Sequence, residues 1–463
     1  MPIIFATHFS CNRLQYTRAV NTNHPLKNPL AWLALALCLL TVVIYQPGLS
    51  GDYMFDDRTN LLENKRLEME TLSMENLVNA AYSSGSGTLR RPISMASFAL
   101  NRYFFGIAPY SHKVVNLVIH LLTGAALWLL GSLIVRSYRV RHSAHLSTGV
   151  ARWLPLVVAG LWLVHPLNLT TVLYIVQRMA GLSALFSVVA LCLYLLGRMR
   201  MQAGNTGMPH ILTGLFLFGS LAVLSKENAV LLPLYMLVLE ATLFRFRDQH
   251  GNKDKRIHGF FGLTLALPVL LVLLALIFYP EKLVNYGVRT FSMFERVLTE
   301  ARVLIFYLKM IFIPSVNELG LYHDDISISR GLLDPPTTLL SILALAGLLG
   351  TAVAMITRNA LFSLGILWFF AGHMLESTVI SLEIAHEHRN YLADYGILFA
   401  ACALISRAKF EQLGPALRIA GPTVLLLLLS YTTWLRAGQW SDNVNHALYE
   451  AEHHPQSPRA VFA

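Results

Sequence analysis

Long apolar stretches alternate with short polar ones along most of the chain. Each apolar stretch is about 20 residues long, the length at which a helix crosses the roughly 30 Å hydrocarbon core of a bilayer. The spans that we predict are residues 29–45, 113–135, 153–176, 181–196, 211–224, 229–244, 260–279, 337–356, 361–380, 393–405 and 417–435. The pattern therefore predicts an all-α polytopic membrane protein with about eleven transmembrane helices.

Basic residues gather in alternate connections between these spans, at residues 136–152, 198–200 and 245–256. The positive-inside rule places such connections in the cytoplasm. The domains that we predict are a cytoplasmic N-terminal tail at 1–28, a transmembrane domain at 29–435 and a short extracytoplasmic C-terminal tail at 436–463. The same rule accounts for the net charge of +10, so we expect no nucleic-acid partner.

One further stretch, residues 291–314, is long enough to cross but carries several charges. These are Glu295, Arg296, Glu300, Arg302 and Lys309. If it crossed, the basic residues from 358 to 418 would lie outside, against the charge rule. We therefore expect an interfacial or re-entrant helix whose polar groups are shielded by protein or by a wet cavity.

The first extracytoplasmic loop, residues 51–112, carries two adjacent carboxylates, Asp56 and Asp57. Apolar residues recur at helical spacing later in this loop, which predicts helices lying in the membrane interface, with Arg90 and Arg91 at headgroup depth. The two carboxylates form the roof of an active site or cap a surface helix, since Asp is favoured at helix N-caps. Both interpretations stay open from the pair alone.

Other polar residues lie near the same face of the predicted bundle. They are His112, Asn116, His165, Gln177, Arg178, Lys226, Glu227, His386, His388, Arg389 and Tyr391. Polar groups at such positions are costly in a membrane and are therefore functional candidates. Interhelical hydrogen bonds and ordinary solvated turns are the alternatives.

The histidines do not form a metal motif. His386 and His388 are two residues apart, and the zinc pattern with histidines four apart is absent. We predict no metal site and no cofactor, and leave a divalent cation open. Arg389 suits a phosphate clamp because its planar fork matches phosphate oxygens.

Carboxylates and cations on one face suit group transfer from a lipid-linked phosphate. Asp56 or Asp57 would deprotonate an acceptor hydroxyl. The cations that we expect on the donor phosphate are Arg91, Arg178, Lys226 and Arg389. The residues that we expect to shape the pocket are His112, Asn116, His165, Gln177, Glu227, His386, His388 and Tyr391. A transporter could use similar residues, so the chemistry alone does not decide.

Five motifs carry a resemblance to a known family. In chain order they are FDDRTNLLEN, RRPISMASFALNRYFFGIAPYSHKVVNLVIHLL, HPLNLTTVLYIVQRMAGLSALF, LSKENAVLLPLYMLVLE and HEHRNYLADYGI. Together they resemble the membrane module of tetratricopeptide-repeat protein O-mannosyltransferases and their bacterial relatives, which are GT-C glycosyltransferases. The resemblance covers most of residues 30–440, and the family's repeat domain is missing from this sequence.

The resemblance implies a GT-C fold and a polyprenyl-phosphate-linked sugar donor. The sugar would pass, with inversion, to a hydroxyl of an extracytoplasmic protein or glycan. The family's base matches Asp56 or Asp57, its last motif places Arg389, and its Lys-Glu turn places Lys226 and Glu227. We expect a multi-pass protein of the bacterial inner membrane, in contact with membrane lipid, with its site facing the periplasm.

Two other functions remain alternatives from the sequence. One is an O-antigen ligase or polymerase, although such enzymes tend to carry their large loop late in the chain. The other is a transporter or flippase for a lipid-linked saccharide, which predicts paired half-repeats that the sequence lacks. The donor sugar and the acceptor are not encoded in any motif.

Overall fold

The computed structural model describes residues 29–141, 146–278, 285–287, 289–407 and 414–462. These residues form helices, with isolated bridges and no named strand among them. The predicted all-α polytopic membrane fold is confirmed. The predicted N-terminal tail, residues 1–28, lies outside the described residues.

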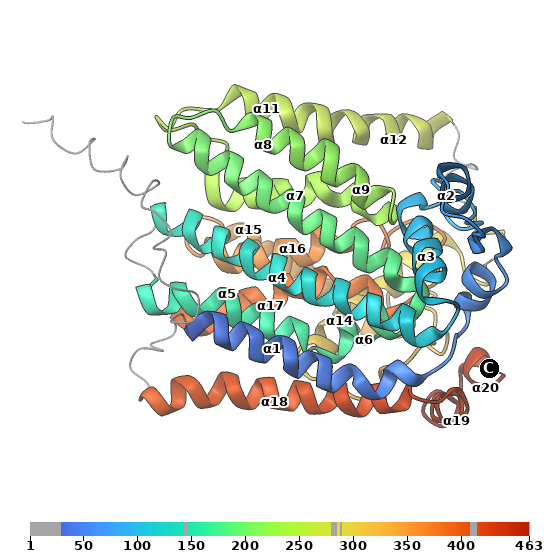
Figure 1. Cartoon of the computed structure of the whole chain (residues 1–463). Helices are drawn as coiled ribbons and strands as arrows, with labels where there is room; N and C mark the ends of the chain where they lie inside the picture. The colour runs from blue at the N-terminus through green and yellow to red at the C-terminus, as the bar shows by residue number, and fades with distance from the viewer. Residues whose placement is uncertain (1–28, 142–145, 279–284, 288, 408–413, 463) are drawn as a thin grey trace, which may run out of the picture.

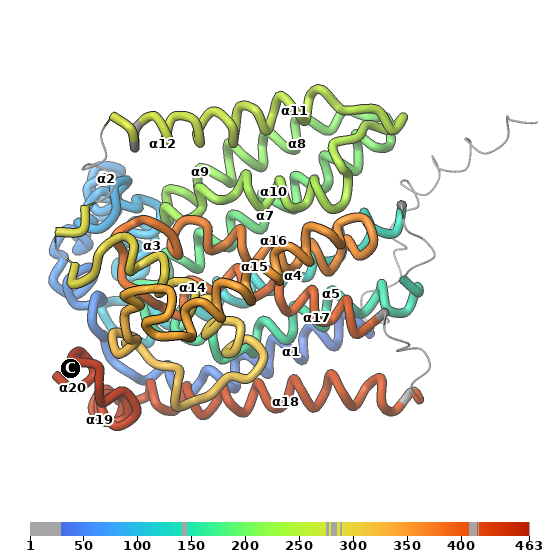
Figure 2. The backbone as a smooth tube through the Cα atoms, turned by 180° about the vertical axis from the view of Figure 1, so that it is seen from behind, coloured from blue at the N-terminus to red at the C-terminus, as the bar shows by residue number. Residues whose placement is uncertain are grey.

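Long helices run side by side through the bundle (Figures 1 and 2). The α-helices are α1 (Pro29–Tyr45), α2 (Met74–Ala81), α3 (Pro92–Phe105), α4 (Pro109–Arg141), α5 (Thr148–Leu163), α6 (Leu169–Leu173), α7 (Arg178–Gln202), α8 (Met208–Thr213), α9 (Ser220–Val223), α10 (Leu232–Leu239), α11 (Lys255–Phe261), α12 (Leu267–Phe278), α14 (Met293–Phe312), α15 (Thr337–Ala354), α16 (Ala360–His373), α17 (Ala393–Arg407), α18 (Pro415–Gln439), α19 (Asn443–His453) and α20 (Pro458–Val461). Shorter helical turns are η2 (Gln46–Ser50), η3 (Arg58–Leu62), η4 (Lys65–Leu67), η5 (Pro166–Asn168), η6 (Ile175–Gln177), η7 (Gly214–Gly219), η8 (Glu227–Leu231), η9 (Glu240–Phe244), η10 (Gly262–Ala266) and η11 (Glu387–Asn390).

Seven helices among the described residues are long and apolar enough to cross a membrane. An eighth span results if α5 and the bent segment after it are counted together. Three shorter apolar helices lie at Met208–Val223, Ala360–His373 and Ala393–Ser406. The predicted total of about eleven crossings therefore stays a prediction.

The third predicted span differs from the expectation of one helix over 153–176. Helix α5 ends at Leu163, and the chain then bends by 55° into the segment Pro166–Leu173. Pro166 has no N–H to continue the helix, so the backbone groups around it need other partners. Arg436 of α18 donates to the carbonyl of Pro166 at 2.7 Å, and Thr433 donates to that of Val164 at 2.6 Å.

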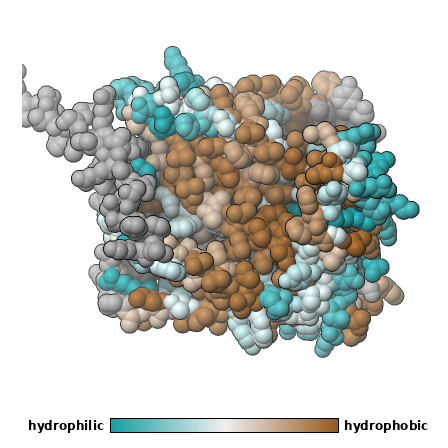
Figure 3. Space-filling view, viewed as in Figure 1, coloured by the Kyte–Doolittle hydropathy of each residue, from teal (hydrophilic) through white to brown (hydrophobic). Residues whose placement is uncertain are grey.

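The bundle has an apolar belt and two polar ends (Figure 3). We call one of them the loop end, because the first loop with α2 and α3 and the C-terminal helices α19 and α20 meet there (Figure 1). The two segments are hydrogen-bonded: Asn443 donates to the carbonyl of Tyr53 at 3.2 Å. The C-terminal tail is therefore packed against the first loop.

The stretch predicted at 291–314 forms α14, which is not among the helices apolar enough to span. Its charged residues Arg296 and Glu300 are buried. Arg296 donates to carbonyls of residues 376, 378, 382 and 383, at 2.6–3.0 Å. Protein thus shields these polar groups, in agreement with the expectation for this stretch, while its crossing stays untested.

Candidate active site

Asp56 is the exposed member of the adjacent carboxylate pair in the first loop. It follows Phe55, whose φ of 41° puts this non-glycine residue in the left-handed region. Such strained backbone is often found at functional sites. The backbone N–H of Asp56 donates to the Tyr174 hydroxyl at 3.1 Å, and its carbonyl accepts from Asn60 at 2.9 Å. The turn that presents Asp56 is therefore fixed from two sides.

The next carboxylate, Asp57, points into the protein and is 1% exposed. It accepts hydrogen bonds from the backbone N–H groups of Val176 at 2.6 Å, Met54 at 3.2 Å and Ile175 at 3.4 Å. Burial raises the pKa of Asp57 to about 7, and these three N–H donors oppose the rise. Asp57 therefore ties the loop to the bent segment, and Asp56 is the carboxylate that remains accessible.

Two cations lie near the loop end. Lys226 lies in the turn between α9 and η8, and Arg91 lies at the start of α3. Lys226 is nearly buried; its ammonium lies 3.8 Å from a Glu376 oxygen and 3.5 Å from the Gln177 side-chain oxygen. Burial lowers the pKa of Lys226 to about 8, while the charge of Glu376 opposes the change. Arg91 pairs through Nε with Glu227 at 2.9 Å. These are loose or partial pairings.

Arg389 lies on η11, where the chain between α16 and α17 forms the histidine-rich motif. Its Nη1 donates to the carbonyl of Ile384 at 2.8 Å and its Nη2 to that of Glu383 at 2.6 Å. A Glu300 oxygen lies 3.9 Å away. Backbone carbonyls thus hold the guanidinium in place without neutralising its charge.

Beside Arg389, His386 and His388 stack with ring centroids 5.0 Å apart. Burial and the charge of Arg389 lower the pKa of His386, and burial and the charge of Lys226 lower that of His388. Burial is the larger cause for both histidines, and the positive charges of Arg389 and Lys226 add to it; such positive charge favours a bound anion.

Asp56 and Arg389 lie at the same end of the bundle and are joined by a chain of contacts through Phe55, Arg459 and Glu383. The Arg459 guanidinium of α20 lies 5.6 Å from the centroid of the Phe55 ring. It also pairs with the Glu383 carboxylate at 3.1 Å, and Glu383 supplies the carbonyl that holds Arg389. The two predicted halves of the site are therefore neighbours, linked by a residue of the C-terminal tail.

Arg178, which was predicted to bind the donor phosphate, is bonded to protein groups in the structure. It is fully buried at the start of α7 and donates to the side-chain oxygens of Asn116 and Asn101, each at 2.7 Å. It also donates to the carbonyls of Ser97 and His112. Its protein partners leave it no access to the exposed loop surface. Arg178, with Asn116 and His112, holds α3, α4 and α7 together.

Two other predicted pocket residues also support the fold. His165 bridges the carbonyl of Ile311 at 3.0 Å and the backbone N–H of Leu167 at 3.2 Å, which stabilises the break after α5. The Tyr391 hydroxyl bonds to Nδ1 of His120 at 2.8 Å. Tyr391 nevertheless lines, with His388 and Arg389, a small hollow between α7, α10 and α16.

Several site residues were absent from the sequence-based prediction: Tyr174, Glu300, Glu376, Glu383 and Arg459. The charges of 291–314 were a usable signal, because buried charges in an apolar chain need partners. The described residues contain no group of three or more His, Cys, Asp or Glu side chains placed to hold a metal ion.

Curated proteins resemble this chain in sequence, although no protein-family model matches it. It is 27% identical over 215 residues to the human protein O-mannosyl-transferase TMTC4, covering 44% of this chain and 28% of that protein. It is 25% identical over 303 residues to the Drosophila melanogaster protein O-mannosyl-transferase Tmtc2, covering 63% of this chain and 30% of that protein. Its sequence relatives are protein O-mannosyl-transferases.

These relatives confirm the resemblance expected from the five motifs and agree with a GT-C glycosyltransferase. The aligned region spans less than a third of each relative. A crystal structure of the Archaeoglobus fulgidus oligosaccharyltransferase, tethered to an acceptor peptide, matches with a TM-score of 0.46 and 15% identity, covering 90% of this chain and 56% of that chain.

Proposed function

We propose that this chain is a GT-C membrane glycosyltransferase. It transfers a sugar from a polyprenyl-phosphate-linked donor to a hydroxyl of an extracytoplasmic acceptor protein. The names of its relatives support transfer to protein. The observation that carries the proposal is the placement of the exposed Asp56 carboxylate next to a group of underpaired cations at the loop end.

Asp56 acts as the general base. Its carboxylate takes the proton of the acceptor hydroxyl as the hydroxyl oxygen bonds to the anomeric carbon of the sugar. The bond between that carbon and the phosphate oxygen breaks, and its electron pair leaves with the polyprenyl phosphate. One attack from the opposite face inverts the anomeric carbon, so a second catalytic carboxylate is unnecessary.

Lys226, Arg91 and Arg389 stabilise the leaving phosphate. Lys226 has a carboxylate 3.8 Å away, Arg91 is paired with Glu227 through Nε alone, and Arg389 is held by backbone carbonyls, so each has donors left for a ligand. Charge that develops on the phosphate oxygens is stabilised most by such preplaced donors. Asp57 positions the base turn through the backbone of Ile175 and Val176.

The orientation follows from charge. The basic segments 198–200 and 245–256 lie at the end of the bundle opposite the loop end (Figure 1). The positive-inside rule assigns that opposite end to the cytoplasm. We place the protein in a bacterial inner membrane, with the loop end in the periplasm.

The test compares transfer by the full-length protein with that by Asp56→Asn and Asp57→Asn. We expect Asp56→Asn to lower the rate by roughly 10²- to 10⁴-fold, because loss of a general base has an effect of this size. Asp57→Asn should lower protein yield as well as activity, since it alters a buried anchor. The matched control is Asp52→Asn, an exposed carboxylate of the same loop.

Mass spectrometry of extracytoplasmic proteins, with and without the chain, identifies the product. A single sugar on a protein supports the proposal. Transfer of a whole glycan block would indicate a ligase, and movement of lipid-linked sugar without a covalent product would indicate a transporter. Full activity of Asp56→Asn would exclude Asp56 as the base.

A further inference from the structure

A second polar cleft lies in the first loop, beside the base turn. It encloses about 710 Å³ of space open to solvent and is lined by Arg66 and by parts of the segment 82–90. Its aromatic side chain is Tyr82, which is exposed, and no carboxylate lines it. The cleft is therefore hydrophilic and positively charged.

Both arginines of the cleft are available to a ligand. Among the residues that the structure describes, neither Arg66 nor Arg90 has a hydrogen bond or ion pair through its guanidinium. By contrast, Arg102 of the same loop pairs with Glu68. Two unpaired guanidinium groups in one cleft favour a ligand with carboxylate or phosphate oxygens.

Hydrogen bonds connect the segment that lines this cleft to the turn that carries Asp56, the proposed base. Asn60, which donates to the carbonyl of Asp56, accepts from the Ser86 hydroxyl at 3.2 Å. Asn64 donates to the Ser83 hydroxyl at 3.0 Å. The cleft and the proposed base thus belong to one connected piece of the loop.

The other side of the cleft lies beside the ion pair between Arg91 and Glu227. Gly87 has φ of +74°, and a Cβ there would collide with the Glu227 carboxylate that pairs with Arg91. Arg90 and Arg91 both have positive φ, 56° and 48°, a conformation that is unfavourable for non-glycine residues. In this turn Arg91 reaches Glu227 while its neighbour Arg90 lines the cleft.

We propose that this cleft binds the acceptor, and that it selects peptides with Asp or Glu side chains flanking the accepting Ser or Thr. Calling the ligand an acceptor rests on the proposed function. The position of the cleft, between Asp56 and the Arg91–Glu227 pair, allows an anchored peptide to present its hydroxyl to the base. The absence of a carboxylate from the lining makes a basic peptide unfavourable there.

Binding of labelled serine peptides to the full-length Asp56→Asn protein tests the proposal without turnover. One peptide carries Asp on both sides of the serine, and its counterpart carries Lys. We expect the acidic peptide to bind roughly fivefold to tenfold more tightly, from two partly exposed charge pairs. The double variant Arg66→Glu/Arg90→Glu should reverse the preference.

A milder variant, Arg66→Gln/Arg90→Asn, should bring the two affinities together, and Asn tolerates the positive φ at residue 90. Arg58→Glu changes an exposed arginine of the same loop outside the cleft and should leave the preference intact. An unchanged preference in both double variants would overturn the proposal. We expect excess unlabelled acidic peptide to displace the labelled peptide. If phosphatidylglycerol vesicles displaced it instead, the cleft would be assigned to a lipid headgroup and the proposal would fail.

The outcome is separable from that of the proposed function. If Asp56→Asn still transferred sugar, the assignment of the base would fail while the charge preference could stand. If the peptides bound without charge preference and Asp56→Asn were inactive, the cleft proposal alone would fail.

Discussion

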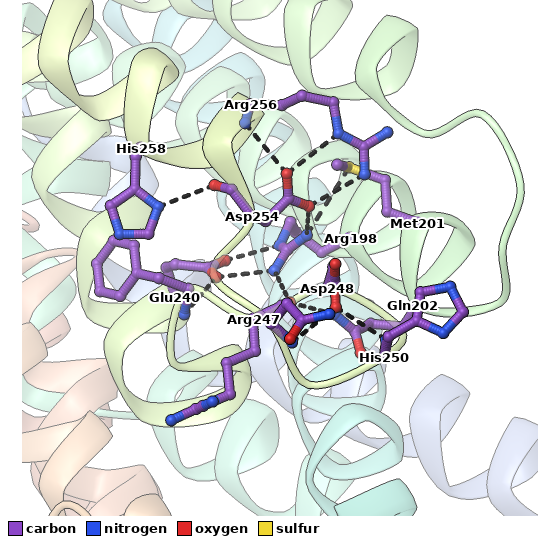
Figure 4. A network of polar contacts seen from close by, with 12 residues as sticks. Arg198, Met201, Gln202, Glu240, Arg247, Asp248, His250, Asp254, Arg256 and His258 are labelled. Atoms are coloured by element: carbon purple, nitrogen blue, oxygen red, sulfur yellow. Dashed lines mark hydrogen bonds and ion pairs between the residues drawn. The ribbon is translucent and has the colours of Figure 1, made fainter.

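Two groups of buried charges lie at opposite ends of this bundle, and they are built differently. At the basic end, Arg198 of α7 pairs with both oxygens of Glu240 at 2.8 Å, with both side chains fully buried (Figure 4). Tyr194 donates to Glu240 at 2.6 Å, and Phe246 donates through its backbone at 3.0 Å. Arg198 also lies 3.5 Å from an oxygen of Asp254. We call this network closed, because the charges of Arg198 and Glu240 are paired within the protein.

At the loop end the charges are less completely matched. Lys226 and Arg389 lie 3.8 and 3.9 Å from their nearest carboxylates. One oxygen of Glu227 is buried without a hydrogen-bond partner among the described residues, whereas Glu300 is paired with Arg296 at 2.7 Å. Buried polar groups are normally satisfied, so such exceptions need an explanation. A phosphate bound by the two cations, and an acceptor hydroxyl that donates to the free Glu227 oxygen, would supply it.

The comparison separates charges that hold the fold from charges kept for a ligand. A buried charge that loses its partner is costly, whereas a charge with partial pairing and access to solvent can change partners. The closed network should therefore control stability, and the loop end should control activity. The following variants test that division.

The largest effect on stability is expected for Arg198→Met. It leaves Glu240 buried without its cation, which costs roughly 3–5 kcal/mol. Thermal unfolding in detergent and the yield of monodisperse protein measure the loss, while the activity per folded molecule should remain. The matched control is Arg256→Met, at the exposed rim of the same network, with a loss of at most about 1 kcal/mol.

The double variant Arg198→Met/Glu240→Met sharpens this test. Removing both charges replaces a buried pair by apolar side chains, which is often neutral. Stability should therefore return toward the parent value. A double variant as unstable as Arg198→Met alone would show that the network contributes something other than charge matching.

Lys226→Met should give the opposite result at the loop end. We expect transfer to fall by roughly 10²-fold, the effect of removing one donor to developing negative charge. Stability should change little, because the pairing with Glu376 is long. Steady-state transfer and thermal unfolding are measured on the same preparation. A large loss of stability with normal specific activity would place Lys226 among the structural charges.

Much of the architecture could be predicted from the sequence because the membrane imposes a strong rule. Apolar windows predicted an all-α polytopic protein, and the structure has that fold. The break at Pro166 was harder to place, because the residues after it are apolar and extend the hydropathy signal to Val176. Hydropathy reports burial, and a bent segment inside the bundle is as buried as a helix that crosses it.

The candidate site could be predicted in part, for a related reason. Lys226, Glu227 and Arg389 are conspicuous in an apolar chain, and they lie at the same end of the bundle as Asp56. Arg178 was equally conspicuous, but its asparagine partners come from separate helices, and their convergence depends on packing. A polar residue in a membrane segment therefore indicates a partner without indicating whether that partner is protein or ligand.

The smallest expected effect is a shift in pH dependence at Arg459, which no sequence signal marked. Asp56 must be ionised to accept a proton, so transfer falls as pH drops through its pKa. Burial raises the pKa of Asp56, and the charge of Glu383 adds to this rise. A hydrogen bond from Tyr174 and the charges of Arg459 and Arg91 lower the pKa.

In Arg459→Ala the loss of positive charge raises the pKa of Asp56, so the acidic limb of the pH–rate profile moves to higher pH. The rate on the plateau should change by less than about fivefold, since Arg459 is partly exposed. Arg459→Lys should keep the limb near its original position, and Phe462→Ala, an exposed neighbour in the same tail, should not move it. A limb that stays fixed in Arg459→Ala, or moves to lower pH, would show that the C-terminal tail contacts the loop end without acting on the base.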